Sequence, residues 1–132
     1  MTTLINDSKI TCFEKKNWKE NCAIGFEFMP NNDGVILFAY NIKKDYTGRP
    51  ENTRLYCPAE NLCDIYNAFA NNTSIVITDK EHNGFRLMVT CGNTVTLENT
   101  QVSSERIHIE DQTFVTTTKM LLQQYIIRVV LG

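Results

Sequence analysis

The sequence predicts an α+β protein in which a unit of four strands and one helix occurs twice. Runs of alternating apolar and polar residues are separated by turn sequences, every fourth run is followed by a run with helical spacing, and the order then repeats. We expect one unit over about residues 9–72 and another over about 73–132, as antiparallel sheets with helices packed on one side. Because neither unit alone would bury enough surface, the 132 residues should form a single domain.

The first unit should contain four strands. We expect them at residues 9–13, 23–28, 35–44 and 53–57. Pro30–Gly34 is a strong turn sequence and makes the second and third strands a hairpin. The third strand should place one set of side chains on a single face, namely Ile36, Phe38, Tyr40 and Ile42.

A helix that begins near Pro58 should end the first unit. Proline suits the first helical turn because its missing N–H would be unpaired there in any case. Leu62, Ile65, Tyr66 and Phe69 recur at helical spacing and form an apolar stripe. This stripe would cover the small sheet.

The second unit follows the same plan with shorter turns. We expect its strands at residues 74–78, 85–90, 94–98 and 106–109. The turns His82–Gly84 and Cys91–Asn93 are typical of hairpins. A last helix should run from about Thr116 to Leu131.

The last helix is apolar nearly all round in its final turns. Such a helix either lies sunk between two sheets or packs against another subunit. We favour the subunit contact and expect a homodimer or a higher homo-oligomer. The expected interface residues are Leu122, Tyr125, Ile126, Val129 and Val130.

Composition argues for an ordinary globular protein and against membrane insertion. The chain is 42% hydrophobic and 21% charged, and no apolar run approaches the roughly 20 residues that a bilayer span needs. The first residues lack the blocks of a signal peptide. Five cysteines, an odd number without Cys-x-x-Cys spacing, predict reduced thiols in a soluble intracellular protein of the cytoplasm, nucleoid or nucleus.

No motif for catalysis, metal binding or cofactor binding is present. The sequence has no Gly-x-Ser-x-Gly, no His-Glu-x-x-His and no glycine-rich phosphate loop. His82 and His108 have no ligand spacing to each other or to the cysteines. We therefore expect no catalytic residue, no metal and no cofactor, and an enzyme is the least favoured class.

Basic residues are interleaved with aromatic ones in the first half of the chain. Cations that follow the phosphates and rings that stack on the bases hold single-stranded nucleic acid with little sequence readout. The candidate contact residues are Lys15, Lys16, Trp18, Lys19, Lys43, Lys44, Tyr46, Arg49, Arg54 and Tyr56. The same pattern would arise without nucleic-acid binding if the lysines were solvated turn residues and Tyr56 were a core residue with a solvent-exposed hydroxyl. The net charge of −2 adds no bulk attraction to nucleic acid.

Part of the first half resembles a known group of single-strand binders. Val35–Ile42 resembles the long third strand of the positive-cofactor-four-type coactivator domain, and Gly48–Pro50, Thr53–Tyr56 and Pro58–Glu60 resemble the segment after it. The order of elements over the whole chain is similar to that of the Whirly and PUR families, and small phage and viral single-strand binders use such folds. The resemblance implies a Whirly-like fold with DNA on the exposed sheet face and helices in the dimer contact.

Pattern and resemblance together predict a non-catalytic protein that binds single-stranded DNA, or less favourably RNA, with low sequence specificity. It would act in replication, recombination or transcription. The alternative is a viral or accessory protein-interaction module that docks through a sheet edge or the last helix and binds no nucleic acid. A third reading is a sliding-clamp-like replication accessory domain.

Overall fold

The chain forms two four-stranded antiparallel sheets and two long helices, which confirms the α+β class. The structure is a computed structural model that describes residues 11–29, 33–42, 53–78, 84–101 and 106–131. The first sheet has the order β1 (Thr11–Asn17), β2 (Cys22–Phe28), β3 (Gly34–Asn41) and β4 (Thr53–Pro58). The second has the order β5 (Ser74–Ile77), β6 (Phe85–Thr90), β7 (Thr94–Asn99) and β8 (Arg106–Glu110).

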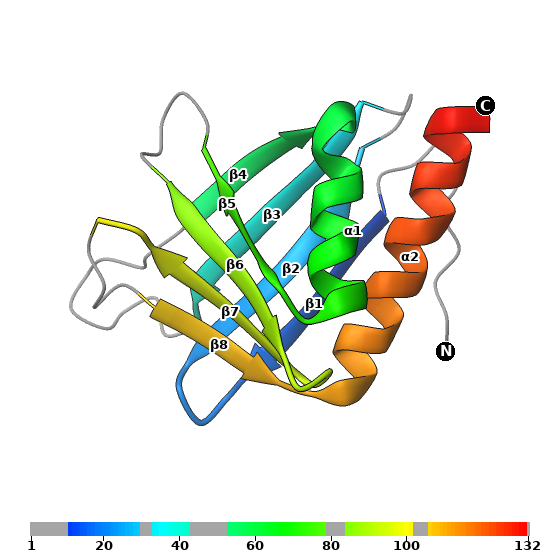
Figure 1. Ribbon diagram of the computed structural model, residues 1–132. Coiled ribbons are helices and arrows are strands. Elements are labelled where there is room, and N and C mark those ends of the chain that lie inside the picture. The colour runs from blue at the N-terminus through cyan, green and yellow to red at the C-terminus, as the bar shows by residue number, and fades with distance from the viewer. Residues whose placement is uncertain (1–10, 30–32, 43–52, 79–83, 102–105, 132) are drawn as a thin grey trace.

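Each sheet is followed in the chain by a helix. A short 3-10 turn, Ala59–Asn61, leads from β4 into α1 (Leu62–Asn71), and α2 (Gln112–Leu131) follows β8. The two sheets cross, and both helices lie along the same side of the molecule (Figure 1). The helices pack on each other, α1 also contacts β5 and β6, and α2 contacts β1 and β7. Within the described residues, no helix is long and apolar enough to cross a membrane.

One hydrophobic core is shared by both sheets and both helices. Alternate residues of the first sheet point into it, such as Phe26 on β2, Leu37 on β3 and Leu55 on β4, and the pairing register sets these three side by side. The second sheet contributes Leu87 and Val95, among others. Each large side chain that becomes fully buried contributes about 1.5–3 kcal/mol. The core therefore holds the two halves together as one unit.

The opposite face of the first sheet points away from this core. Because side chains alternate along a strand, burial of Val35, Leu37 and Ala39 turns Phe38 and Tyr40 outward. We call this surface the outer face. Its members on the four strands are Cys12, Glu14, Lys16, Ala23, Gly25, Glu27, Ile36, Phe38, Tyr40, Arg54 and Tyr56.

The last helix is deeply packed within its own chain. Leu121, Leu122 and Tyr125 have no exposed surface, and the Tyr125 ring packs against Phe28 at 5.5 Å between ring centroids. Two of the expected subunit-contact residues, Leu122 and Tyr125, are thus accounted for by the core of one chain. The partly buried Ile126 and Val129 also pack on the core. Of the expected interface, Val130 remains open to solvent, with 70% of its surface exposed.

Three strand or helix boundaries differ most from the sequence prediction. The third strand ends at Asn41 instead of residue 44, because its pairing with β2 ends there, at Cys22. The first strand runs on to Asn17 instead of ending at Phe13, because its polar residues lie on an edge strand that pairs with β2 over its full length. The last helix begins at Gln112 instead of Thr116. Asp111 caps it, since the Phe114 N–H donates to Asp111 Oδ1 at 2.7 Å.

Candidate nucleic-acid interface

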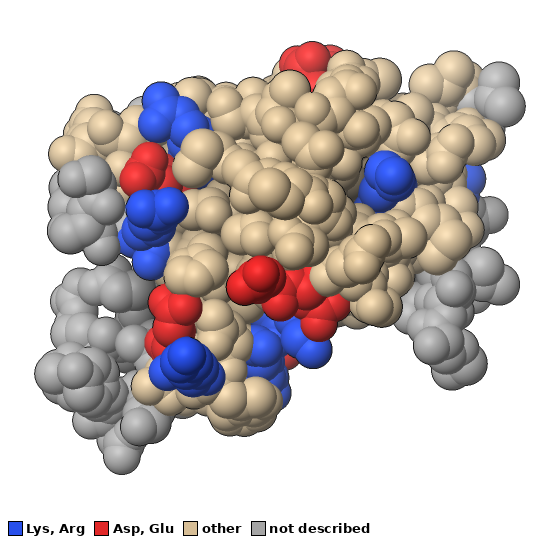
Figure 2. All heavy atoms as spheres, turned by 60° about the horizontal axis from the view of Figure 1, so that its bottom comes forward, with Lys and Arg blue, Asp and Glu red and all other residues tan. Residues whose placement is uncertain are grey.

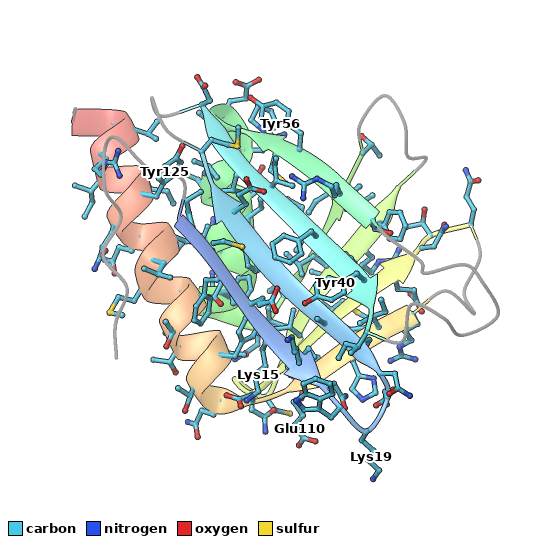
Figure 3. All side chains as sticks on the ribbon, turned by 180° about the vertical axis from the view of Figure 1, so that it is seen from behind. Lys15, Lys19, Tyr40, Tyr56, Glu110 and Tyr125 are labelled. Atoms are coloured by element: carbon cyan, nitrogen blue, oxygen red, sulfur yellow. The ribbon has the colours of Figure 1, made fainter. Side chains whose placement is uncertain are left out.

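The outer face is the side of the first sheet that points away from the shared core. Seen from behind, β1 to β4 lie in front of both helices and of the second sheet, and Tyr40 projects from them toward the viewer (Figure 3). A hollow of about 640 Å³ lies on this face. The side chains that line it include Cys12, Glu14, Lys16, Glu27, Phe38, Tyr40, Ile42 and Arg54. The hollow thus combines rings, cations and carboxylates.

Aromatic rings form the floor of this hollow. Phe38 and Tyr40 stack along β3, with centroids 6.2 Å apart and ring planes 18° apart. Phe38 lies over Gly25 of the neighbouring strand, where an added Cβ would collide with the Phe38 ring and would lie 2.7 Å from Glu14 Cβ. The missing side chain of Gly25 lets the phenyl ring lie close to the sheet. Phe38 is consequently only 8% exposed, and Tyr40 is the more accessible ring.

The Tyr40 hydroxyl is held by a carboxylate. It donates a hydrogen bond to Glu14 Oε2 at 2.8 Å across β2. Burial, followed by this hydrogen bond to Glu14, raises the pKa of Tyr40 to about 12. The phenol therefore stays neutral at physiological pH, and its ring orientation is fixed by Glu14.

Both described cations of the hollow have carboxylate partners. Arg54 Nη2 lies 2.9 Å from Glu27 Oε1, and Lys16 Nζ lies 3.9 Å from Glu14 Oε2. The Arg54 pair reaches from β4 across β3 to β2. These pairs orient the cations over the hollow, and a bound anion would have to compete for them.

Tyr56 lies on the outer face near its upper end in Figure 3. Its hydroxyl donates to the Asp33 carbonyl oxygen at 2.8 Å, and 45% of the residue is exposed. The ring is accessible, while its polar end is tied to the residue just before β3. The location of Arg54 and Tyr56 on one face of the fourth strand agrees with the alternation in the sequence.

The turn between β1 and β2 presents Trp18 and Lys19 at one end of the outer face. Trp18 is 66% exposed, and Lys16 Nζ lies 5.2 Å from the centroid of its ring. Asn17 stabilises the turn, because its Oδ1 accepts the Glu20 N–H at 3.2 Å and its Nδ2 donates to the His108 carbonyl at 3.1 Å. The exposed indole of Trp18 therefore lies on a turn that these hydrogen bonds hold in place.

Lys15 does not share the outer face with Lys16. Neighbouring residues of a strand point to opposite sides, and Lys15 points to the α2 side, where its Nζ lies 3.2 Å from Asp111 Oδ2. The remaining predicted contacts, Lys43, Lys44, Tyr46 and Arg49, belong to the connection between β3 and β4 and lie outside the described residues.

Charges of both signs alternate over the end of the molecule that Figure 2 brings forward, and neither sign forms a continuous patch there among the described residues. Pairing of oppositely charged side chains accounts for part of this mixed distribution of charges. Arg86 lies 3.4 Å from Glu98 on the second sheet, and His108 Nε2 lies 3.1 Å from Glu20 Oε2. At this end of the molecule, attraction between the described residues and an anionic ligand is therefore local.

The described residues offer little for metal or thiol chemistry. No group of three or more potential metal ligands occurs within the described ranges. Cys22 and Cys57 are buried, and Cys12, Cys63 and Cys91 are exposed. Burial raises the pKa of Cys22 to about 11, so its thiol is protonated near neutral pH.

Four outer-face residues were missed as site candidates: Glu14, Glu27, Phe38 and Tyr40. The sequence does place Phe38 and Tyr40 on one face of the third strand, but both faces of that strand are apolar. Which of them the helices cover is decided by tertiary packing. The two glutamates acquire their role only through cross-strand neighbours.

Searches against protein-family models, curated proteins and solved structures found no match to this chain.

Proposed function

We propose that this chain binds single-stranded nucleic acid, DNA in preference to RNA, on the outer face of the first sheet, without chemistry and with little sequence preference. The supporting observation is the hollow on that face. Its floor has aromatic rings, and Lys16 and Arg54 stand on its wall. Rings that stack on bases and cations that neutralise phosphates are the two components of sequence-tolerant single-strand binding.

The strand would follow the face from the β1–β2 turn toward β4. Trp18 at the turn offers an exposed ring next to Lys16, and Tyr40 offers one inside the hollow. Stacking on an aromatic side chain is worth about 1–3 kcal/mol per base. A face with few unpaired cations can therefore still bind through its rings. A Whirly-like relationship and a role in replication, recombination or transcription belong to the same proposal.

The test is fluorescence anisotropy of a labelled oligo-dT at about 50 mM and about 200 mM salt. Binding should weaken with salt. The double variant Lys16→Glu/Arg54→Glu should bind at least about tenfold more weakly and flatten the logarithmic salt slope by about 1.4, or 0.7 for each lost phosphate contact. Arg86→Glu on the second sheet is the matched control and should leave binding unchanged. Absence of wild-type binding at the lower salt would refute the proposal.

A second candidate function is protein contact through the end of α2. Ile127 and Val130 are 49% and 70% exposed, and their spacing of three residues puts them on one side of the helix. Such a side could join two copies of this chain or bind another protein. Light scattering with size-exclusion chromatography tests self-association. Ile127→Glu/Val130→Glu should convert any oligomer to monomer, and a wild-type monomer at all concentrations would exclude the homo-oligomer.

A further inference from the structure

The described part of the outer-face hollow contains as many negative as positive side chains. Lys16 and Arg54 are balanced by Glu14 and Glu27, so the charges sum to 2 − 2 = 0. The carboxylates are the more buried partners. The side chains of Glu14 and Glu27 are 32% and 19% exposed, against 40% and 60% for Lys16 and Arg54. They are also fixed in place, Glu14 by the Tyr40 hydroxyl and Glu27 by Arg54.

These carboxylates are the partners of the two described cations, so a phosphate that approached either cation would meet a carboxylate already beside it. A phosphate that approaches Arg54 displaces Glu27 from its hydrogen bond, and one that approaches Lys16 is repelled by Glu14. The net gain from charge alone is therefore small. A ligand gains affinity on this surface only if it also offers flat apolar groups to Tyr40 and Trp18.

Single strands and duplexes differ in this respect. A single strand can turn its bases onto the rings, whereas a duplex keeps its bases stacked inside and presents mainly phosphates. We propose that Glu14 and Glu27 are specificity-determining residues that make the outer face select single strands over duplexes. This inference rests on the proposed binding function and adds the residues that control its selectivity.

The test compares a single strand and a duplex of about 20 nucleotides, since this length exceeds the usual site of one small domain. The variant is Glu14→Gln/Glu27→Gln. Glutamine keeps an oxygen that accepts the Tyr40 and Arg54 hydrogen bonds and removes only the charge. Both ligands are measured by anisotropy at about 50 mM salt for the wild type and the variant.

We expect the variant to bind the duplex at least about fivefold more tightly than the wild type does, with a smaller gain for the single strand. Selectivity for the single strand should therefore fall. Glu98→Gln is the matched control, because Glu98 makes a comparable cross-strand pair with Arg86 on the second sheet, away from the hollow. Glu98→Gln should change the affinity for neither the single strand nor the duplex.

An unchanged ratio of the two affinities in the double variant would overturn the inference while leaving the proposed function standing if oligo-dT still binds. Failure of every form to bind either ligand would overturn both. Thermal unfolding checks that the variants are folded. If the double variant is not folded, Glu27→Gln alone serves, since it leaves the hydrogen bond between Tyr40 and Glu14 intact, and it should shift the ratio in the same direction.

Discussion

The Tyr125 hydroxyl accepts a hydrogen bond from the Gly34 N–H at 3.0 Å and donates one to the Met29 carbonyl at 2.7 Å. These contacts join α2 to the two ends of the β2–β3 connection, where Met29 N–H also donates to the Gly34 carbonyl at 3.0 Å. A single buried side chain therefore ties α2 to the hairpin of the first sheet.

Tyr125→Phe should lower the free energy of unfolding by about 1–3 kcal/mol, because it leaves two backbone groups without their partner. Urea unfolding followed by circular dichroism measures the change. Tyr66→Phe on α1 is the control, since the Tyr66 hydroxyl makes no hydrogen bond within the described residues. Equal stability of the two variants would contradict the role assigned to the Tyr125 hydroxyl.

Asp111→Asn should make the free energy of unfolding depend less on pH in the acidic range. The Phe114 N–H, and secondarily Lys15, lowers the pKa of Asp111 in the folded state. A lowered folded pKa means that this contribution is present above the unfolded pKa of about 3.9 and is lost as pH falls below it. Unfolding measured from about pH 6 to about pH 3 should show the wild type losing its advantage over Asp111→Asn.

The contribution of the N-cap hydrogen bond of Asp111 can be measured separately from the contribution of its charge. Asp111→Ala removes the acceptor of the Phe114 N–H and should cost about 1 kcal/mol beyond Asp111→Asn at neutral pH. If the alanine and asparagine variants were equally stable, the hydrogen bond to the helix would contribute nothing.

Gly25→Ala should destabilise the protein by about 1–3 kcal/mol through overpacking. Its methyl group would meet the Phe38 ring on one side and the Phe13 carbonyl oxygen, at 2.8 Å, on the other. Adding Phe38→Ala to the Gly25→Ala variant should recover part of the lost stability, because it removes the clash with the ring. The recovery should be partial, because the close contact with the Phe13 carbonyl oxygen remains. The free energies of the two single variants and the double variant, from urea unfolding, give the coupling. Simple additivity would show that the ring and the glycine do not interact.

Cys12 should report occupancy of the hollow. It is exposed and lines the hollow, whereas the exposed Cys63 lies on α1 and Cys91 in the β6–β7 turn. Saturating oligo-dT should slow alkylation of Cys12 at least about fivefold and leave the other two unchanged, as read by mass spectrometry. Burial raises the pKa of the Cys12 thiol, so the reaction is best run at about pH 9. Uniform rates with and without oligo-dT would place the ligand elsewhere.

Strong local patterns were sufficient to predict most of the fold. Apolar alternation and a glycine-containing turn predicted the end of β2 and the start of β3 to within one residue, and Pro58 marked the turn that precedes α1. The first strand was predicted too short, because the edge strand β1 has charged side chains whose partners come from elsewhere, such as Asp111 for Lys15. The start of α2 had a usable signal in Asp111, a favourable N-cap residue that was overlooked.

The candidate site was less accessible to sequence reasoning. Extending the first strand would have separated Lys15 from Lys16, since strand neighbours face opposite ways. No local pattern could show that Phe38 rests on Gly25 or that Glu27 faces Arg54, because these contacts depend on the register between strands. The face that the helices cover is likewise a property of the assembled core.

The contacts of Tyr125 also bear on how the protein folds. The groups that it joins are 91 and 96 residues apart in sequence, so the β2–β3 hairpin gains these hydrogen bonds only when α2 packs against it. Contacts this distant slow folding. Until α2 has packed, the apolar side chains of the first sheet have no complete cover, so a partly folded chain exposes them and is prone to aggregation.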